Sequence, residues 1–396
     1  MREVPAGVTA THRLNSSEAD RLWQWVLRRQ GVGSSDRYAT VPDIVDATLG
    51  LHAARLSSPF ATVLARARTP EIALRLWHPA THQVVTTVRC MRKTLHTLPL
   101  NLAAVAHAAT LHYRERDALR QILNADLSTP LIARTARAIQ ALLTEHGRLT
   151  PRQIEERLAT GVTTVVAVRL ALKLGWERGL FTYRNRSSSW NRELRTFALT
   201  ATVHPQLDMN LDRATATEQL VAEYFDRYGP ASLRDVTWWS GLSRTRIIAA
   251  LDRIGQPLIA LHTPWAPAPL YMFRHRFREF EQISSGEPPP AEPVLLAHED
   301  VALKAYAETR TRYLGLLDQR AAFNQIGEAL PTILLAGRVV GVWSWDTRVR
   351  AVTHTLFRGH TSPADRAGIR RAAERVTAAL RQGSRPQQPD DTPLAP

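Results

Sequence analysis

Residues 215–242 read TATEQLVAEYFDRYGPASLRDVTWWSGL, and residues 131–158 read LIARTARAIQALLTEHGRLTPRQIEERL. Each stretch begins with apolar residues at helical spacing, such as Leu220 and Tyr224 in the first. Each then reaches a glycine and a short segment that opens with helix-capping residues. The same features in the same order at matching offsets predict an internal repeat.

Each stretch is followed by a third helical segment, expected around 163–176 in one copy and 243–254 in the other. Two strand-like runs come next in both copies: GLFTYRN and LRTFALTATV in the first, PLIALHT and PLYMFRH in the second. Three helices followed by a two-stranded hairpin are the winged-helix arrangement. Two short helices around a glycine also fit any αα-hairpin, but the complete pattern occurs twice and favours winged helices.

The N-terminal part reads as a third, more divergent copy. We expect its helices at 15–30, 41–53 and 57–68, and its hairpin strands within 83–100. The helix at 57–68 would be the recognition-type helix. The turn before it, residues 49–59, reads LGLHAARLSSP.

The pattern changes beyond residue 285. GEPPPAEP (286–293) is typical of a linker, and a helix near 298–314 follows it. Strands at 331–345 and 350–359, with a tight hairpin at Gly337, then precede a closing helix at 363–381.

The sequence therefore predicts a mainly α fold with β structure (α+β), in which three tandem winged-helix domains precede a small C-terminal β-barrel-like module. The predicted units are an N-terminal winged helix with the candidate active-site turn (1–125), a second winged helix (126–208), a third winged helix (209–284), the β-rich module (285–381) and a disordered tail (382–396).

The charge of the chain indicates its partner. There are 51 Lys and Arg against 36 Asp and Glu, a formal charge of +15. Such a chain attracts polyanions, and nucleic acid is the commonest in a cell. An anionic membrane surface is the rival partner, but we find neither a basic amphipathic anchor nor a run of about 18 apolar residues.

The positive charge is concentrated in two places. From Arg55 to Arg116 nine Arg and Lys stand against two acids, so residues 50–116 are the predicted nucleic-acid-facing surface, although a solvated face that binds nothing has the same composition. A second cluster lies on the first predicted wing, where Tyr183 and Trp190 occur among the arginines and Tyr183 is expected to pack across the hairpin. The arginines of this second cluster are Arg178, Arg184, Arg186, Arg192 and Arg195.

The number of cysteines and the N-terminal sequence indicate the cellular location of the protein. Cys90 is the single cysteine, so no internal disulfide can form, which fits a reducing cytosol. The first 20 residues lack an apolar core, so we expect no signal peptide and a cytoplasmic location. His78, His82, Cys90 and His96 have metal-binding side chains, but their spacing matches no compact zinc pattern, so no metal and no cofactor are expected.

Four stretches carry a resemblance to a known family. They are GLHAARLSSPFATVLARAR (50–68), MRKTLHTLP (91–99), YGPASLRDVTWWSGLS (228–243) and LLAGRVVGVWS (334–344). In this order they resemble the AlkZ/YcaQ-like bacterial DNA glycosylases, which typically show a G-L-Q-A-Q run, an R-x-T-L-H hairpin motif, a Y-G-P-A pattern with a later W-x-G, and a D-G-R-V-V-G-x-W strand pair.

The resemblance implies hydrolysis of the N-glycosidic bond of alkylated or crosslinked purines, often N7-substituted guanines, as DNA repair or as self-resistance to a DNA-alkylating antibiotic. The family's catalytic motif is Q-Φ-Q or Q-Φ-D, and its two polar positions fall on His52 and Ala54. His52 is therefore the predicted catalytic residue, because imidazole can accept a hydrogen bond or a proton. Ala54 has no chemical function.

The hairpin motif retains Arg92, Thr94 and His96, with Arg92 suited to a phosphate and His96 expected near His52. The predicted DNA-contacting residues are Arg55, Arg66, Arg68, Arg92, Lys93, Thr94, His96, Arg184 and Arg186. Trp238 and Trp239 suit base stacking or, more in keeping with their helix, core packing. Asp235 is expected to cap or pair.

We therefore expect a monomeric, monofunctional DNA glycosylase that acts on double-stranded DNA with alkylated or bulky lesions. A catalytically degenerate DNA binder or lesion sensor of the same fold is the main alternative. A winged-helix transcription regulator is the third, although three joined copies differ from the usual dimer that reads a palindrome.

Overall fold

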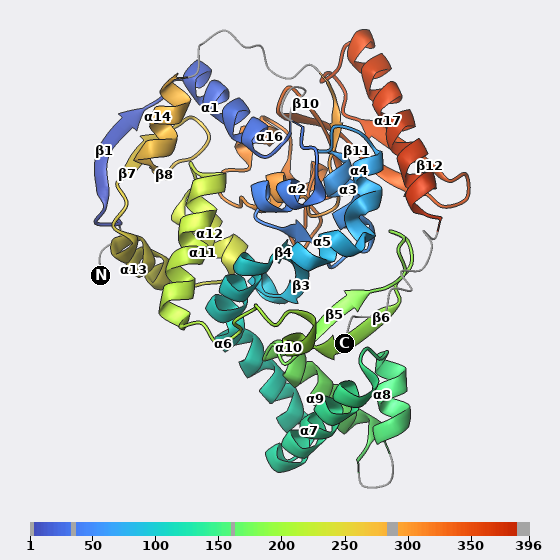
Figure 1. The fold of residues 1–396 in the computed structure, drawn as a ribbon. Coiled ribbons are helices and arrows are strands. Elements are labelled where there is room, and N and C mark those ends of the chain that lie inside the picture. The colour runs from blue at the N-terminus through green and yellow to red at the C-terminus, as the bar shows by residue number, and fades with distance from the viewer. Residues whose placement is uncertain (1–3, 33–36, 160–162, 283–291, 386–396) are drawn as a thin grey trace.

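The computed structural model describes residues 4–32, 37–159, 163–282 and 292–385, and its strands form three separate sheets (Figure 1). One contains β1 (Val8–Arg13), β7 (Leu258–His262) and β8 (Leu270–Phe273). The five-stranded sheet runs in the order β2 (Leu51–His52), β4 (Leu95–Pro99), β3 (Val85–Arg89), β5 (Phe181–Asn185), β6 (Arg195–Leu199). The third runs β12 (Ala351–Leu356), β11 (Arg338–Asp346), β10 (Thr332–Leu335), β9 (Val294–Leu295).

The two predicted helix trios are confirmed. They are α7 (Thr129–His146), α8 (Pro151–Leu158) and α9 (Val165–Glu177), followed by β5 and β6, and α11 (Arg213–Tyr228), α12 (Leu233–Ser240) and α13 (Arg244–Ile254), followed by β7 and β8. Thr150 and Ser232 each close a capping box, with Gln153 and Asp235 as the reciprocal partners. The predicted capping role of Asp235 is therefore confirmed.

The N-terminal copy has α1 (Ser16–Arg29), α2 (Val41–Ala47) and α3 (Ser57–Leu64). The prediction of a helix as far as residue 53 was wrong. Leu49 and Gly50 have φ values of +47° and +92°, which end the helix and turn the chain into β2. A Cβ on Gly50 would lie 2.4 Å from a methyl carbon of Leu98, so glycine is required at this turn.

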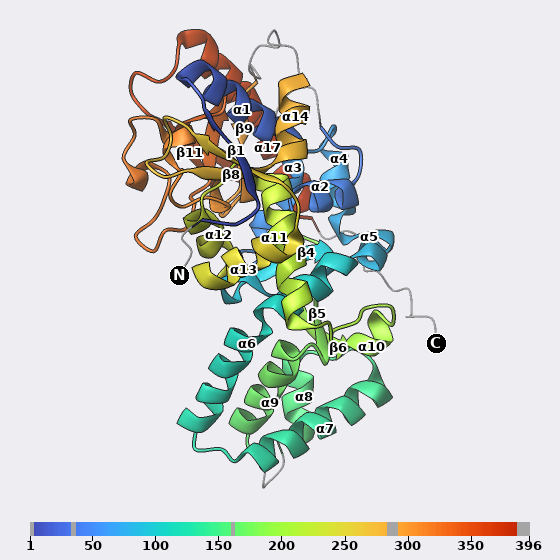
Figure 2. The ribbon, with the colours of Figure 1, turned by 90° about the vertical axis from the view of Figure 1, so that its left-hand side faces the viewer.

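The hairpins of the first two copies share one sheet, because β3 pairs with β5 at Thr87 and Tyr183. Helix α6 (Leu100–Asn124), which the sequence analysis did not identify, packs against α9 and α11. Figure 2 shows α6 leading from the body of the molecule to the α7–α9 unit at its lower end. The remaining helices between β2 and β9 are α4 (Glu71–Leu74), α5 (Pro79–Val84), α10 (Thr200–Val203) and α14 (Arg274–Gln282), with 3₁₀ turns at Arg75–Trp77 and Met91–Lys93.

The expected helix near 298–314 is replaced by two short helices, α15 (Val301–Lys304) and α16 (Thr311–Leu314). The N–H groups of Ala307 and Glu308 each donate to Asp235 Oδ1 at 2.7 Å, and these bonds replace the ones that would continue α15. A 3₁₀ turn follows at Gln319–Ala321.

The C-terminal sheet is open rather than barrel-like in the described residues, because β12 and β9 are its two edges. Its β10–β11 hairpin turns at Ala336 and Gly337, as predicted, with φ values of +47° and +76°. Helix α17 (Pro363–Gly383) packs against β12 and β9. Most of the expected linker and residues 386–396 of the expected tail lie outside the described residues.

The loop between β5 and β6 reaches the C-terminal part of the chain. Trp190 is buried, and its Nε1 donates to Leu380 O at 2.7 Å. Its ring stands edge-on to Trp345, with centroids 5.5 Å apart. Tyr183 packs within its own hairpin, opposite Phe197, as predicted.

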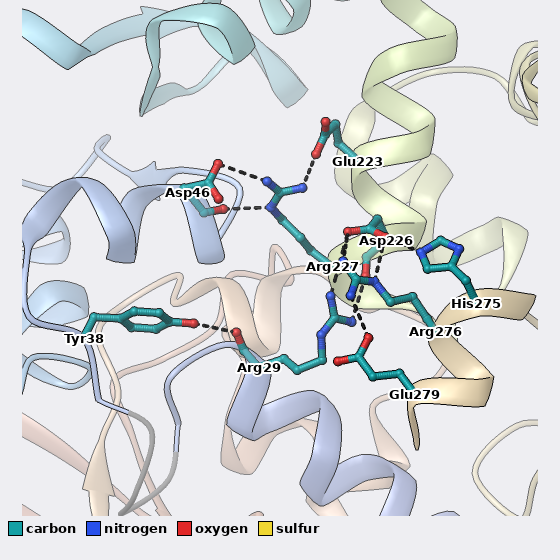
Figure 3. A network of polar contacts seen from close by, with 9 residues as sticks. All are labelled: Arg29, Tyr38, Asp46, Glu223, Asp226, Arg227, His275, Arg276 and Glu279. Atoms are coloured by element: carbon teal, nitrogen blue, oxygen red, sulfur yellow. Dashed lines mark hydrogen bonds and ion pairs between the residues drawn. The ribbon is translucent and has the colours of Figure 1, made fainter. Parts of the chain in front are cut away.

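A polar network joins α1, α2, α11 and α14 (Figure 3). Asp226 lies at its centre and accepts from Arg276 at 2.7 and 2.8 Å and from His275 at 3.1 Å. Burial raises the pKa of Asp226, but the hydrogen bonds and charge of Arg276 and the charge of Arg29 outweigh it, so this pKa lies below its ordinary value. Arg227 extends the network to Glu223 and to Asp46.

Candidate functional site

The turn at Leu49–Gly50 directs His52 into the interior. Strand β2 pairs with β4 so that His52 lies directly opposite His96, and the two rings stand edge-on with centroids 5.5 Å apart. Only 4% of His52 and 2% of His96 is exposed. The predicted proximity of the two histidines is confirmed, whereas Ala54, two residues beyond His52, is exposed.

A carboxylate and an ammonium lie beside His52. His52 Nε2 is 4.0 Å from Glu299 Oε2, and Lys304 Nζ is 2.9 Å from the same oxygen. The backbone N–H of Ala329 donates to the other oxygen, Glu299 Oε1, at 2.7 Å. Glu299 and Lys304 are both buried and were missed by the sequence analysis, since both lie more than 240 residues beyond His52 within an expected continuous helix.

A buried ion pair holds this segment in place. Arg66 Nη1 and Nη2 donate to the two oxygens of Asp300 at 2.8 and 2.7 Å, and Arg66 Nε donates to Gln30 O. Asp300 also caps α15 through the N–H of Ala302. Both charged side chains are fully buried, so the prediction that Arg66 contacts DNA was wrong: this arginine anchors the segment that carries Glu299 and Lys304.

The electrostatics of the site keep the histidines neutral. Burial and the charge of Lys304 hold the pKa of His52 far below its ordinary value, and the same two causes lower the pKa of His96. Burial raises the pKa of the Cys90 thiol to about 12, and Cys90 Sγ lies 3.5 Å from His96 Nδ1. At neutral pH the site thus holds neutral imidazoles and a protonated thiol, next to the contact between Glu299 and Lys304.

Charged side chains lie around the turn that contains Ala54. Arg55 is well exposed and lies 3.6 Å from Glu328, which is also 3.5 Å from His298. Arg92 stacks on the ring of Trp238 at 3.7 Å. Arg310 also lies over the ring of Trp238, at 5.3 Å, so arginines of the protein itself contact this indole, whereas Trp239 is in the core.

The tip of the β3–β4 hairpin has an uncommon backbone. Arg92 and Lys93 have φ values of +51° and +62°, a region that residues other than glycine rarely occupy. Lys93 pairs with Asp117 at 2.5 Å, and the Thr94 hydroxyl donates to Met91 O at 3.0 Å. The strained tip presents Arg92 toward Trp238, and observed strain of this kind is frequent at functional sites.

The other predicted DNA contacts differ in exposure. Arg68 and Arg186 are exposed and Arg184 is half-buried. Part of the basic stretch at 50–116 is internal, because Arg114 is fully buried against Glu177 at 2.6 Å and Arg89 pairs with the same carboxylate. Counting charges overestimated the exposed charge of this stretch for that reason.

The described residues offer neither a metal site nor a membrane-spanning helix. Within them, His, Cys, Asp and Glu side chains nowhere come together in a group of three that would suit a metal ion. Among the same residues no helix combines the length and the apolar character that a membrane span requires.

Comparison with known proteins identifies the family of the chain. The family model for AlkZ-like DNA glycosylases matches residues 45–379, from within α2 into α17. The chain belongs to the AlkZ-like DNA glycosylase family. Family membership supports a DNA glycosylase for damaged DNA and implies that the protein binds DNA.

A solved structure shows the same fold. The Streptomyces sahachiroi DNA glycosylase AlkZ superposes with a TM-score of 0.73 at 19% sequence identity, over 92% of this chain and 97% of that one. No curated protein matches the chain. The AlkZ-like fold is therefore present along nearly the whole chain despite large sequence divergence.

Proposed function

We propose that this protein is a monofunctional DNA glycosylase that hydrolyses the N-glycosidic bond of N7-alkylated purines in double-stranded DNA. The observation that carries the proposal is the position of His52. It occupies the first polar position of the family's catalytic motif, and its ring lies 4.0 Å from the buried carboxylate of Glu299.

The reaction suits a neutral imidazole. An N7-alkylated purine is cationic, so it leaves as a neutral base when it takes the electron pair of the N-glycosidic bond. Water adds to C1′ and releases a proton to solvent. Because a pKa far below the usual value makes His52 a weak base, its role is to hold the water by accepting a hydrogen bond rather than to take the proton.

In this proposal Glu299 supplies the negative charge that an aspartate at the second motif position would supply. Its carboxylate favours the oxocarbenium-like sugar, whose positive charge develops as the base departs. The ion pair with Lys304 and the N–H of Ala329 fix its position in advance of the reaction. In this proposal Glu299 compensates for the alanine at position 54.

The architecture supports DNA binding. We infer winged helices from the helix trios α7–α9 and α11–α13 with their hairpins, and a third from the N-terminal copy, with the domain limits expected from the sequence. Arg55, Arg68, Arg92, Arg184 and Arg186 are the side chains proposed to contact DNA. The proposed role is repair of alkylated or crosslinked DNA, or self-resistance to an alkylating antibiotic, by a cytoplasmic monomer.

A non-catalytic lesion sensor is the second candidate, and two observations favour it. Ala54 has no polar atom, and both ring nitrogens of His52 are buried without a hydrogen-bond partner in the part of the chain that the structure describes. A sensor needs the fold and the basic surface but not access of water to His52.

One assay separates the two candidates. Duplex DNA with a single N7-methylguanine is incubated with the protein and heated in alkali, and strand breaks at abasic sites are counted. If the protein is a glycosylase, strand breaks should appear at the lesion and be lost in His52→Ala and Glu299→Gln. Ala54→Gln should release more of the base. Binding without release from N7-methylguanine or bulkier N7 adducts would establish the sensor instead.

A matched control guards against misfolding. His298→Ala changes a histidine that is less buried than His52 and lies 3.5 Å from Glu328, outside the His52–Glu299 pair. It should retain base release within about threefold. Equal loss in His298→Ala and His52→Ala would remove His52 from the mechanism.

A further inference from the structure

A cavity of about 440 Å³ opens on the face of the five-stranded sheet opposite His52 and His96. Ala53 and Thr97 line it, and each directly follows one of the two histidines along its strand. Because successive side chains of a strand point to opposite faces, the cavity and the candidate catalytic pair lie back to back. This cavity is thus separate from the site described above.

The cavity has two chemically different walls. Half-buried or buried basic side chains from four different segments form one wall: His82, Arg148, Arg184 and His204. The other wall is apolar and includes Leu76, Trp77 and Pro79. None of the described residues that line the cavity is an aspartate or glutamate.

Two basic side chains of the cavity have unpaired nitrogen atoms. His82 Nε2 and Arg148 Nη1 are buried and, within the described residues, have no hydrogen-bond partner. Burial and the charges of Arg184 and Arg148 lower the pKa of His82 to about 3, and burial and the same two arginines lower that of His204 to about 4. Burial and neighbouring arginines lower the pKa of Arg148 to about 10. At neutral pH both histidines are therefore uncharged, and the positive charge at the cavity comes from its arginines, whose mutual repulsion a bound anion would relieve.

We propose that this cavity binds a nucleotide phosphate of the DNA strand, with the sugar or base of that nucleotide against the apolar wall. Two arginines provide planar donors that match phosphate oxygens, and the exposed Arg186 extends the basic surface from the cavity along the hairpin. A cationic alkylated base is repelled here, so the occupant is an undamaged nucleotide. The proposal rests on the DNA binding of the proposed function but not on its catalysis.

The test measures the salt dependence of binding to an undamaged duplex by fluorescence anisotropy. Each phosphate contact contributes about 0.9 to the slope of log Kd against log salt concentration. Arg148→Gln should therefore reduce the slope by about 0.9 and weaken binding, and His204→Gln should weaken binding without abolishing it. Arg148→Lys should show the salt dependence of the parent but a lower affinity, because lysine keeps the charge and lacks the planar guanidinium that binds two phosphate oxygens at once.

Arg152→Gln is the matched control. Arg152 lies four residues after Arg148, is 88% exposed and pairs with Glu156. The same change of slope in Arg148→Gln and Arg152→Gln would show only a general charge effect and overturn the proposal. Should Arg148→Gln fail to fold, as judged by its thermal transition, His204→Gln and Arg148→Lys carry the test.

Free dTMP distinguishes the source of the phosphate. Titration with dTMP should shift the ring resonances of His82 and His204 in the unmodified protein, and duplex DNA should compete with it. If dTMP shifts these resonances but Arg148→Gln leaves the salt dependence of DNA binding unchanged, the cavity binds a free nucleotide and the assignment to DNA is overturned. Failure of base release from every adduct would remove the proposed catalysis and leave these binding results unaffected.

Discussion

The buried pair of Arg66 and Asp300 yields the most quantitative prediction. Asp300→Asn removes the negative charge but keeps the side-chain oxygen that caps α15. Arg66 then remains fully buried without its counter-ion. Breaking a buried pair in this way costs about 3–5 kcal/mol, which corresponds to a shift of the unfolding equilibrium by roughly two to four powers of ten.

The double variant Arg66→Met/Asp300→Asn tests the cause. It removes both charges, so most of the penalty of the uncompensated arginine disappears, and we expect it to be at least about 2 kcal/mol more stable than Asp300→Asn. Urea unfolding followed by tryptophan fluorescence measures the difference in the first transition.

Two outcomes would refute this reasoning. One is a single variant that loses less than about 1 kcal/mol, the range of an exposed pair. The other is a folded Arg66→Met variant with strongly reduced affinity for undamaged DNA, since a fully buried guanidinium should leave that affinity within about twofold.

Three further predictions follow from the fold. Asp226→Asn should lower the free energy of unfolding by about 1.5–3 kcal/mol at pH 7. Because the pKa of Asp226 is lowered in the folded protein, its carboxylate stabilises the fold above the ordinary value of 3.8, and this stabilisation is lost as the pH falls below that value. The variant should therefore lose less stability than the parent when urea unfolding is repeated at acid pH, and an unchanged acid profile would contradict the role of Arg276. Trp190→Ala should cost about 3–5 kcal/mol and make α17 more sensitive to limited proteolysis, whereas protection equal to that of the parent would show that the indole does not hold the helix. Gly50→Ala should lower stability by about 1–3 kcal/mol and reduce base release more than binding, because the strained turn places His52; kinetics unchanged in both respects would contradict that role.

The sequence predicted the local elements well where short-range chemistry specifies them. Thr150 and Ser232 start helices because their side chains cap them, and the apolar periodicity continues from those caps. The hairpin motif led us to expect His96 near His52, although the short strand β2 that carries His52 was not predicted. The end of α2 was missed, since the positive φ of Leu49 is not evident from the residue type.

The rest of the site depends on contacts between distant segments. Glu299 reaches His52 only because Asp300 binds Arg66 and Asp235 interrupts the expected helix, and no periodicity encodes either contact. Arg66 and Arg114 were counted as surface charge because the sequence does not reveal their buried counter-ions. The merging of two hairpins into one sheet depends in the same way on a single long-range pairing.

Trp190 has a consequence for the way in which the molecule moves. Its indole bonds to Leu380, 190 residues further along the chain, so the loop of the basic hairpin and the last helix behave as one mechanical unit. The α7–α9 arm is thereby tethered through its own hairpin as well as through α6, which limits its movement when a duplex is bound. A truncation that removes Leu380 would break this hydrogen bond, so shortening the C-terminus should increase the mobility of the β5–β6 hairpin, which is distant in sequence.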